Sequence, residues 1–282
     1  FIGVVGAALA GAPLRMAVDA FGWRGVMAAS AAATAAVAVA IWIVVRDDPA
    51  ERGYASHSGE RLHAAAPSIA AQLVQVARYR NAWLVLAIPG AFSAILFAFA
   101  GLWGVPFLVS QYGFGTASAA LVATAMLVAW ALGGLFFAPL SERLRRRVPV
   151  LAGGLAATLA LWSIVVLVPG LAPAALVAIL LAVAFCAGAF IVVFAFAKES
   201  VPAGLAGTAS GIANMGVMLG GMLMQPLVGY VLDRHGGALG ADGARIRDFA
   251  AYRAGFALTF AWGAASLALL AFARETRCRQ AA

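Results

Sequence analysis

The length of its uncharged runs constrains this chain more than any other feature. Residues 81–141 are 61 consecutive residues without a charged side chain, and residues 148–197 are 50 more. As a single helix the longer run would extend about 92 Å, three times the roughly 30 Å hydrocarbon core of a bilayer. The chain must therefore cross, turn and cross back. Because 64% of its residues are hydrophobic and 11% are charged, we expect a polytopic membrane protein and exclude a soluble domain.

Dividing the uncharged runs at their turns predicts an all-α fold of about eight membrane helices. The turns are rich in glycine, proline and polar residues, as at 110–115 and 168–173. The opening stretch is too short to span and does not begin with methionine, so we expect a fragment of a longer protein. The predicted spans lie near residues 1–14, 25–45, 82–108, 117–140, 149–168, 174–197, 205–232 and 254–273.

Lysine and arginine residues fall unequally on the two sets of alternate loops. The set that includes residues 46–80 and the C-terminus holds 13 of them, and the other set holds 6. Because these residues accumulate on the cytoplasmic side, the first set is predicted to be cytoplasmic. The net charge of +8 then follows from membrane topology, so the lipid bilayer is the expected partner and nucleic acid is not.

The chain lacks the residue patterns of metal sites and of common enzymes. Its two cysteines and three histidines do not cluster, so we expect no metal site and no cofactor. Neither an HExxH nor a GxSxG pattern occurs in or near a span, which argues against a membrane-embedded enzyme. No predicted span carries an ionisable residue away from its ends, so these helices contain no evident proton carrier or anion-binding arginine.

One loop carries a specific motif. Ala138–Arg147 reads APLSERLRRR and resembles the cytoplasmic G-x-L-x-D-R-x-G-R-R turn of the major facilitator superfamily of secondary transporters. Ala138 and Arg145 replace the two glycines of that pattern. The resemblance implies a conformational-switch turn, and the alternative is a solvated basic turn that orients the protein. The residues at the acidic and basic positions of the motif are Glu142, Arg143, Arg146 and Arg147.

A second stretch, residues 198–233, is similar to the tenth loop and eleventh helix of the same family. It combines an acid at each end with regularly spaced glycines and two prolines. Pairs of small residues four apart let membrane helices approach closely, although such pairs also occur in generic helix packing. The helix-packing residues predicted here are Gly207, Gly211, Gly216 and Gly220.

The resemblance covers essentially the whole chain and sets its domain organisation. Family members have twelve helices in two halves, so this chain corresponds to helices 5 to 12. Residues 1–45 are then the end of a truncated N-terminal half, 46–80 a cytoplasmic linker and 81–282 the C-terminal six-helix half. The implied location is a bacterial plasma membrane.

In this architecture substrates bind near the bilayer midplane, between the halves. Polar or aromatic residues well inside the spans are the candidates. Each has an alternative role, because aromatic side chains also pack or anchor at the interface and polar ones also bond their own or a neighbouring helix. The candidates are Ser93, Phe97, Trp103, Thr124, Trp130, Phe190, Asn214 and Gln225.

The leading prediction is a secondary active transporter that moves a small solute by alternating access. The sequence leaves open whether a proton or ion gradient drives it. A truncated transporter without activity is the alternative, and a membrane-embedded enzyme or a channel ranks behind both because neither has a motif here.

Overall fold

The computed structural model describes residues 6, 12–46, 49–55, 68–235 and 247–281. Throughout these ranges every regular element is helical, as predicted. Seven helical segments are long and apolar enough to cross a membrane, which confirms the predicted spans from residue 25 onward. Most of the span predicted near 1–14 lies outside the described residues. The seven segments are Met16–Val44, Arg80–Tyr112, Thr116–Leu144, Val148–Leu167, Pro173–Glu199, Ala203–His235 and Phe249–Leu270.

The chain divides into two compact units, one within Val5–Ser68 and one covering Ile69–Ala282. The smaller unit contains helix α2 (Ala12–Val44) and a short 3-10 turn, η1 (Pro49–Arg52). Helix α2 is two helical pieces joined at a kink at Gly22, whose φ is 73°, and the piece after the kink begins close to the predicted start at residue 25. Glycine adopts a positive φ without a steric penalty, so the chain can change direction at Gly22 between the two helical pieces.

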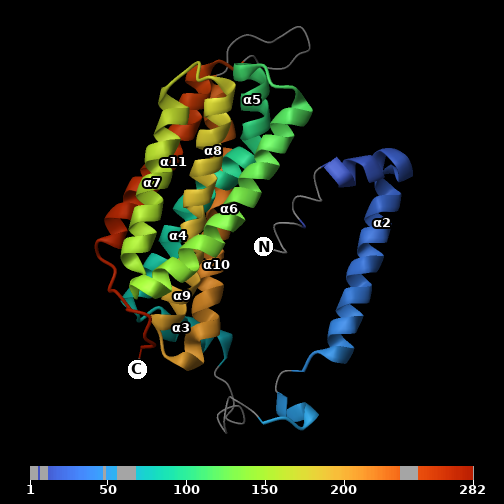
Figure 1. Ribbon diagram of the computed structural model, residues 1–282. Helices are drawn as coiled ribbons and strands as arrows, with labels where there is room; N and C mark the ends of the chain where they lie inside the picture. Colours follow the sequence, from blue (N-terminus) through green and yellow to red (C-terminus); the bar gives the residue numbers. More distant parts are fainter. Residues whose placement is uncertain (1–5, 7–11, 47–48, 56–67, 236–246, 282) are drawn as a thin grey trace. The chain divides into compact units, whose positions relative to one another are not determined.

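The larger unit is a bundle of helices that run up and down side by side (Figure 1). Two of its spans are each built from three helical pieces, and a short helix, α3 (Ile69–Val76), precedes the first of them. In chain order the other elements are α4 (Arg80–Ala98), η3 (Phe99–Trp103), α5 (Gly104–Tyr112), α6 (Thr116–Leu144), α7 (Val148–Leu167), α8 (Pro173–Ala187), η4 (Gly188–Ile191), α9 (Val192–Glu199), η5 (Ala203–Leu205), α10 (Ala206–His235) and α11 (Phe249–Leu270).

Local signals end and begin these helices. Gly113, with φ of 67°, terminates α5 in a left-handed cap, and Pro173 occupies the first position of α8. The Asp248 carboxylate accepts a hydrogen bond of 2.8 Å from the backbone N–H of Ala251, which caps the start of α11. These residues hold the turns between spans at fixed positions.

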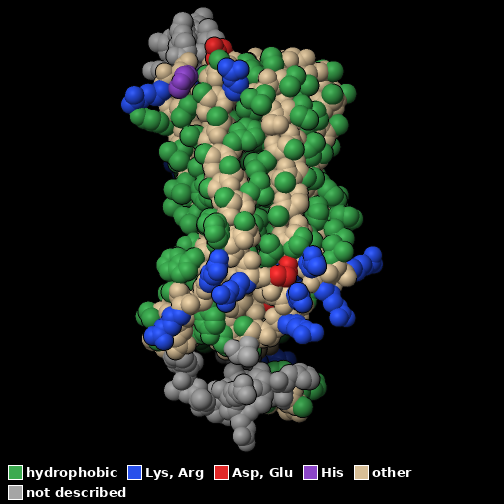
Figure 2. Space-filling view, turned by 90° about the vertical axis from the view of Figure 1, so that its left-hand side faces the viewer, with side chains coloured by type: hydrophobic (Ala, Val, Ile, Leu, Met, Phe, Trp, Pro, Cys, Tyr) green, Lys and Arg blue, Asp and Glu red, His purple; other side chains and the backbone are tan. Residues whose placement is uncertain are grey.

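Helix α4 lies along α10 in the most extensive helix contact of the bundle, and α11 packs on both. Helix α7 joins α11 to α8, and α8 in turn packs on α6. Buried aromatic rings fill the space where η3, α7 and α11 meet: the ring centroids of Phe99 and Trp162 lie 5.3 Å apart, and Phe256 is 5.3 Å from Trp162. On the face shown in Figure 2, hydrophobic side chains cover the middle of the bundle and most basic side chains gather toward its lower end.

Candidate functional site

Two predicted site residues, Trp130 and Phe190, stack on each other midway along their spans. Their ring centroids are 4.3 Å apart and their planes differ by 17°. The ring of Phe97, on α4, meets Trp130 edge-on at 5.7 Å. Trp130 lies near the middle of α6 and Phe190 lies in the 3-10 turn η4, so three different spans bring these aromatic rings together.

Two glycines make this stack possible. A Cβ on Gly133 of α6 would strike backbone atoms of Phe185 and Gly188, and a Cβ on Gly188 would strike the carbonyl oxygen of Trp130. The backbones of α6 and η4 are thus as close as they can be, which small residues permit between membrane helices. Gly133 and Gly188 therefore allow the close backbone approach that brings Trp130 and Phe190 into contact.

A hollow of about 290 Å³ lies against the aromatic pair on α6 and η4. Trp130 is 9% exposed, and its indole Nε1 is buried and has no hydrogen-bond partner. Buried donors are normally paired, and one that is not requires an explanation such as a site for another molecule. The residues that line the hollow are Trp130, Ala131, Gly134, Leu135, Ala138, Pro139, Phe190 and Ile191.

Three other predicted site residues instead bond α4 and η3 to α10. The Ser93 hydroxyl donates to the carbonyl oxygen of Val217 at 2.6 Å. The Gln225 amide donates to the carbonyl oxygen of Phe97 at 2.9 Å, and the Trp103 indole donates to that of Gln225 at 2.9 Å. Their polar groups are used for packing between helices, the alternative role considered for each of them.

The structure leaves two predicted site residues away from the stack. Asn214 is exposed on α10, and Thr124 is half-buried on α6. The four glycines of α10 also divide. Gly216 and Gly220 face α4, where an added Cβ would meet the carbonyl oxygens of Leu86 and Gly90, whereas a Cβ on Gly207 or Gly211 would meet nothing within 4 Å.

Beyond the C-terminal end of α6, one arginine of the predicted turn is buried in an ion pair. The Arg147 guanidinium contacts the Glu199 carboxylate at 2.6 Å, and Arg147 is 4% exposed. Its Nη1 also donates to the Ser141 hydroxyl at 3.0 Å. Burial by itself lowers the pKa of Arg147, but hydrogen bonding to Glu199 and the charge of that carboxylate outweigh it, so the pKa is raised and the side chain stays charged.

The segment after α11 completes this ionic cluster. The Glu275 carboxylate accepts hydrogen bonds from the backbone N–H groups of Arg147, at 2.8 Å, and Val148, at 3.0 Å, where α7 begins. An anion is favoured there because a helix N-terminus carries a partial positive charge. The Thr276 hydroxyl donates to Glu199 at 2.5 Å. Arg147, Glu199, Glu275 and Thr276 are called the ionic cluster below.

The other residues of the predicted turn, Glu142, Arg143 and Arg146, are exposed. Sequence reasoning identified Glu199 as part of the glycine-rich motif but did not pair it with Arg147, and it did not identify Glu275. Glu199 is the last residue of its span and Glu275 lies five residues after the end of α11, and these positions near span ends are the signal in the sequence. Arg147 and Glu199 are 52 residues apart in the chain, so only the packing of the spans brings them together.

Seven helical segments able to cross a membrane, with a buried ionic cluster at one end of the bundle, are the features of a polytopic membrane protein. The family model of the Major Facilitator Superfamily matches residues 1–225. The chain therefore belongs to the Major Facilitator Superfamily of transporters. No curated protein sequence matches it significantly.

Two similar solved structures are of a bacterial homolog of the human lysosomal transporter Spinster. The inward-facing, unoccupied form has a TM-score of 0.57 and 20% identity, with 91% of this chain and 59% of that chain covered. The inward-facing, occupied form has a TM-score of 0.50 and 19% identity, with 89% and 57% covered. This likeness shows the fold, and the chain spans less than two thirds of the length of either neighbour.

Proposed function

We propose that this protein is a secondary active transporter that carries a small solute across the membrane by alternating access. The observation that supports this most is the hollow beside the Trp130 and Phe190 stack, because the stack lies midway along its spans and transporters of this kind bind their substrates near that depth. A channel would be expected to have a ring of selectivity groups, and an enzyme a nucleophile or paired acids, whereas the lining of this hollow is apolar and aromatic.

The chemistry of the hollow suggests which part of a solute enters it. Its walls are hydrocarbon and aromatic rings, and the indole N–H of Trp130, which is buried, has no hydrogen-bond partner. Such a wall favours an uncharged, apolar group carrying one hydrogen-bond acceptor, because an ion would be desolvated without compensation. We propose that this group of the solute stacks near Phe190 and accepts the Trp130 hydrogen bond once the rings move apart.

Replacement of Trp130 tests this site. In the protein that contains residues 1–282, Trp130→Phe should raise the solute concentration for half-maximal uptake by roughly two- to tenfold, the effect of one net hydrogen bond. Trp130→Ala should raise it further, because the ring is lost as well. The measurement is uptake of radiolabelled uncharged aromatic and aliphatic solutes into vesicles, with and without a proton gradient.

The control is Trp42→Phe, which makes the same chemical change on an exposed side chain of α2 and should leave uptake unchanged. Saturable uptake by Trp130→Ala with an unaltered half-maximal concentration would show that the solute does not bind at Trp130. Vesicles that show no saturable uptake of any solute would favour the alternative of a transporter piece without activity.

We propose that residues 1–45 belong to an N-terminal half, residues 46–80 form a cytoplasmic linker and residues 81–282 form a six-helix half in a bacterial plasma membrane. The 13-to-6 split of basic residues supports this orientation. In a variant without native cysteines, a membrane-impermeant thiol reagent should label a cysteine at Gly240, and not one at Ala55, from outside the cell. Labelling at residue 55 alone would show that the orientation is the reverse of the one proposed.

We further propose that the turn from Glu142 to Arg147 takes part in switching between conformations. The turn joins two spans of the bundle, α6 and α7, at the end of α6. Pairs of charges at such a turn can form in one state and separate in another. The exposed Glu142 and Arg143 are available for pairing with another part of the protein, whereas Arg147 is held by Glu199.

A further inference from the structure

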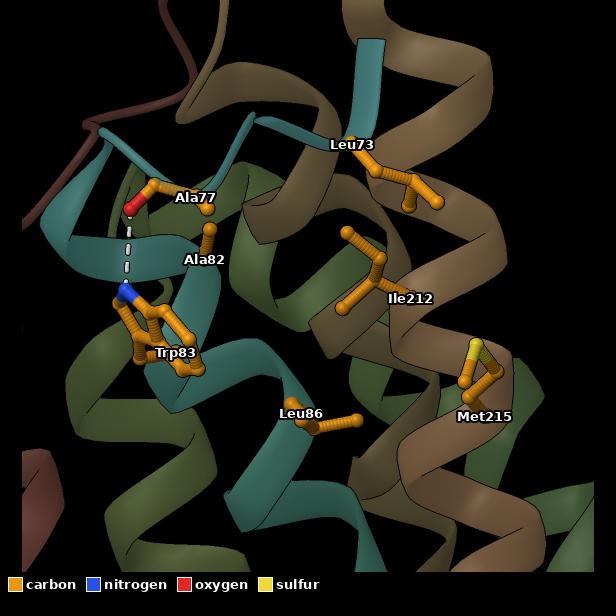
Figure 3. Close-up of a pocket in the computed structure, with 7 residues that line it drawn as sticks. All are labelled: Leu73, Ala77, Ala82, Trp83, Leu86, Ile212 and Met215. Carbon is orange, nitrogen blue, oxygen red and sulfur yellow. Dashed lines mark hydrogen bonds between the residues drawn. The ribbon is translucent and has the colours of Figure 1, made fainter. Parts of the chain in front are cut away.

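At the end of the bundle where α4 begins, three helices enclose an apolar hollow. The hollow has a volume of about 230 Å³ and lies between α3, α4 and α10 (Figure 3). The Thr208 hydroxyl donates to the Gln72 side-chain oxygen at 2.6 Å, which holds α3 against α10. The residues that line the hollow are Leu73, Ala77, Ala82, Trp83, Leu86, Ile212 and Met215.

The rim of this hollow is amphiphilic. Trp83 is 62% exposed, and its indole Nε1 donates to the carbonyl oxygen of Ala77 at 3.0 Å, which fixes the ring beside the hollow (Figure 3). Leu73 and Met215 are also exposed. Tryptophan is typical of the membrane–water interface, and α4 begins only three residues before Trp83, at Arg80.

Two arginines lie on the segment that forms this rim. Arg78 and Arg80 both lie in the chain between Ala77 and Ala82, two residues that line the hollow. Both arginine side chains are exposed. Among the residues that the structure describes, neither forms an ion pair. The sequence contains no acid from residue 61 to residue 141, so no neighbour along the chain neutralises them. An apolar hollow therefore opens beside a segment with two arginines that have no ion-pair partner among the described residues.

We propose that this hollow binds an anionic phospholipid, with an acyl chain against Leu73, Leu86 and Ile212 and with the phosphate at Arg78 and Arg80. Charge complementarity selects this occupant, because an apolar partner alone would leave the guanidinium groups without a counter-charge and a soluble anion would leave the hollow empty. Basic side chains near a membrane surface attract anionic lipids in this way. The site is separate from the aromatic hollow at Trp130, and the proposal does not depend on transport.

Quenching of Trp83 fluorescence by brominated lipids tests the proposal. The protein is placed in nanodiscs of phosphatidylcholine that contain increasing fractions of dibrominated phosphatidylglycerol or, separately, dibrominated phosphatidylcholine. The contribution of Trp83 is the difference between the wild-type protein and Trp83→Phe. We expect the anionic lipid to bind roughly tenfold or more tightly than the zwitterionic one at low salt, since each arginine contributes to the preference.

Arg78→Gln with Arg80→Gln should reduce this preference to nearly one. The matched control, Arg234→Gln with Arg253→Gln, removes the same charge from exposed arginines at the opposite end of the bundle and should keep it. Ala77→Leu, which fills the rim of the hollow, should weaken quenching by both lipids. Inorganic phosphate at millimolar concentration should not displace the brominated anionic lipid.

Three results would overturn the proposal. The first is equal quenching by the two lipids in the wild-type protein, and the second is a preference that survives loss of both arginines. The third is displacement by inorganic phosphate, which would show that Arg78 and Arg80 bind a free phosphate rather than a lipid headgroup.

Discussion

Replacing Glu199 by glutamine is expected to lower the free energy of unfolding by about 3 kcal/mol, because the change leaves the Arg147 charge buried without its partner. Arg147 is 4% exposed, and its closest contact to Glu199 is 2.6 Å. Removing one member of a buried pair costs more than the pair contributes, since the remaining charge is not solvated. The measurement is denaturant unfolding of the purified protein in detergent.

Glu142→Gln provides the control for this prediction. It removes the same charge from an exposed residue of the neighbouring turn, so its effect on stability should stay within about 0.5 kcal/mol. The double variant Arg147→Met with Glu199→Met should recover much of the loss, because apolar residues of similar volume leave no buried charge. Equal losses for Glu199→Gln and Glu142→Gln would show that burial of the pair is not what stabilises this end of the bundle.

Gly220→Leu is expected to lower stability by about 3 kcal/mol and to push α10 away from α4. An added Cβ at this position would strike the Ser93 hydroxyl and the Gly90 carbonyl oxygen, and a leucine adds three further carbons. The same displacement would break the hydrogen bond from Ser93 to Val217. Thermal unfolding in detergent, followed by size-exclusion chromatography, would measure the loss.

Gly207→Leu makes the identical substitution on the same helix, where nothing lies within 4 Å of the added Cβ. Its effect should be small or slightly stabilising, because leucine favours a helix more than glycine does. If Gly207→Leu were as damaging as Gly220→Leu, contact of α10 with α4 would not explain the requirement for glycine.

The spans could be predicted from the sequence because the bilayer sets their length. A charge-free run of about 20 residues matches the hydrocarbon core, so the predicted span near 117–140 lies within α6 and the one near 149–168 matches α7 to within one residue at each end. The breaks inside spans could not be predicted in this way. The π turn at Phe99–Trp103 and the 3-10 turn at Gly188–Ile191 lie in uniformly apolar sequence, where composition does not distinguish one helical hydrogen-bond pattern from another.

The candidate site was predictable in part for a related reason. Aromatic residues such as Trp130 and Phe190 stand out inside a span, but their stacking depends on how closely α6 approaches η4. Ser93 and Gln225 stand out equally, yet their side chains bond carbonyl oxygens of neighbouring helices. Polarity inside a span indicates that a group needs a partner, and only the packing decides whether that partner is a helix or a solute.

The ionic cluster also has a consequence for biosynthesis. Glu199 and Arg147 are synthesised before α11, whereas Glu275 and Thr276, which bond to the start of α7 and to Glu199, are synthesised after it. The N–H groups that open α7 therefore lack their carboxylate acceptor while the later helices are being translated and inserted. We therefore expect this end of the bundle to close only after α11 has been synthesised, so that a nascent chain stalled within α11 is more sensitive to protease there than the complete chain.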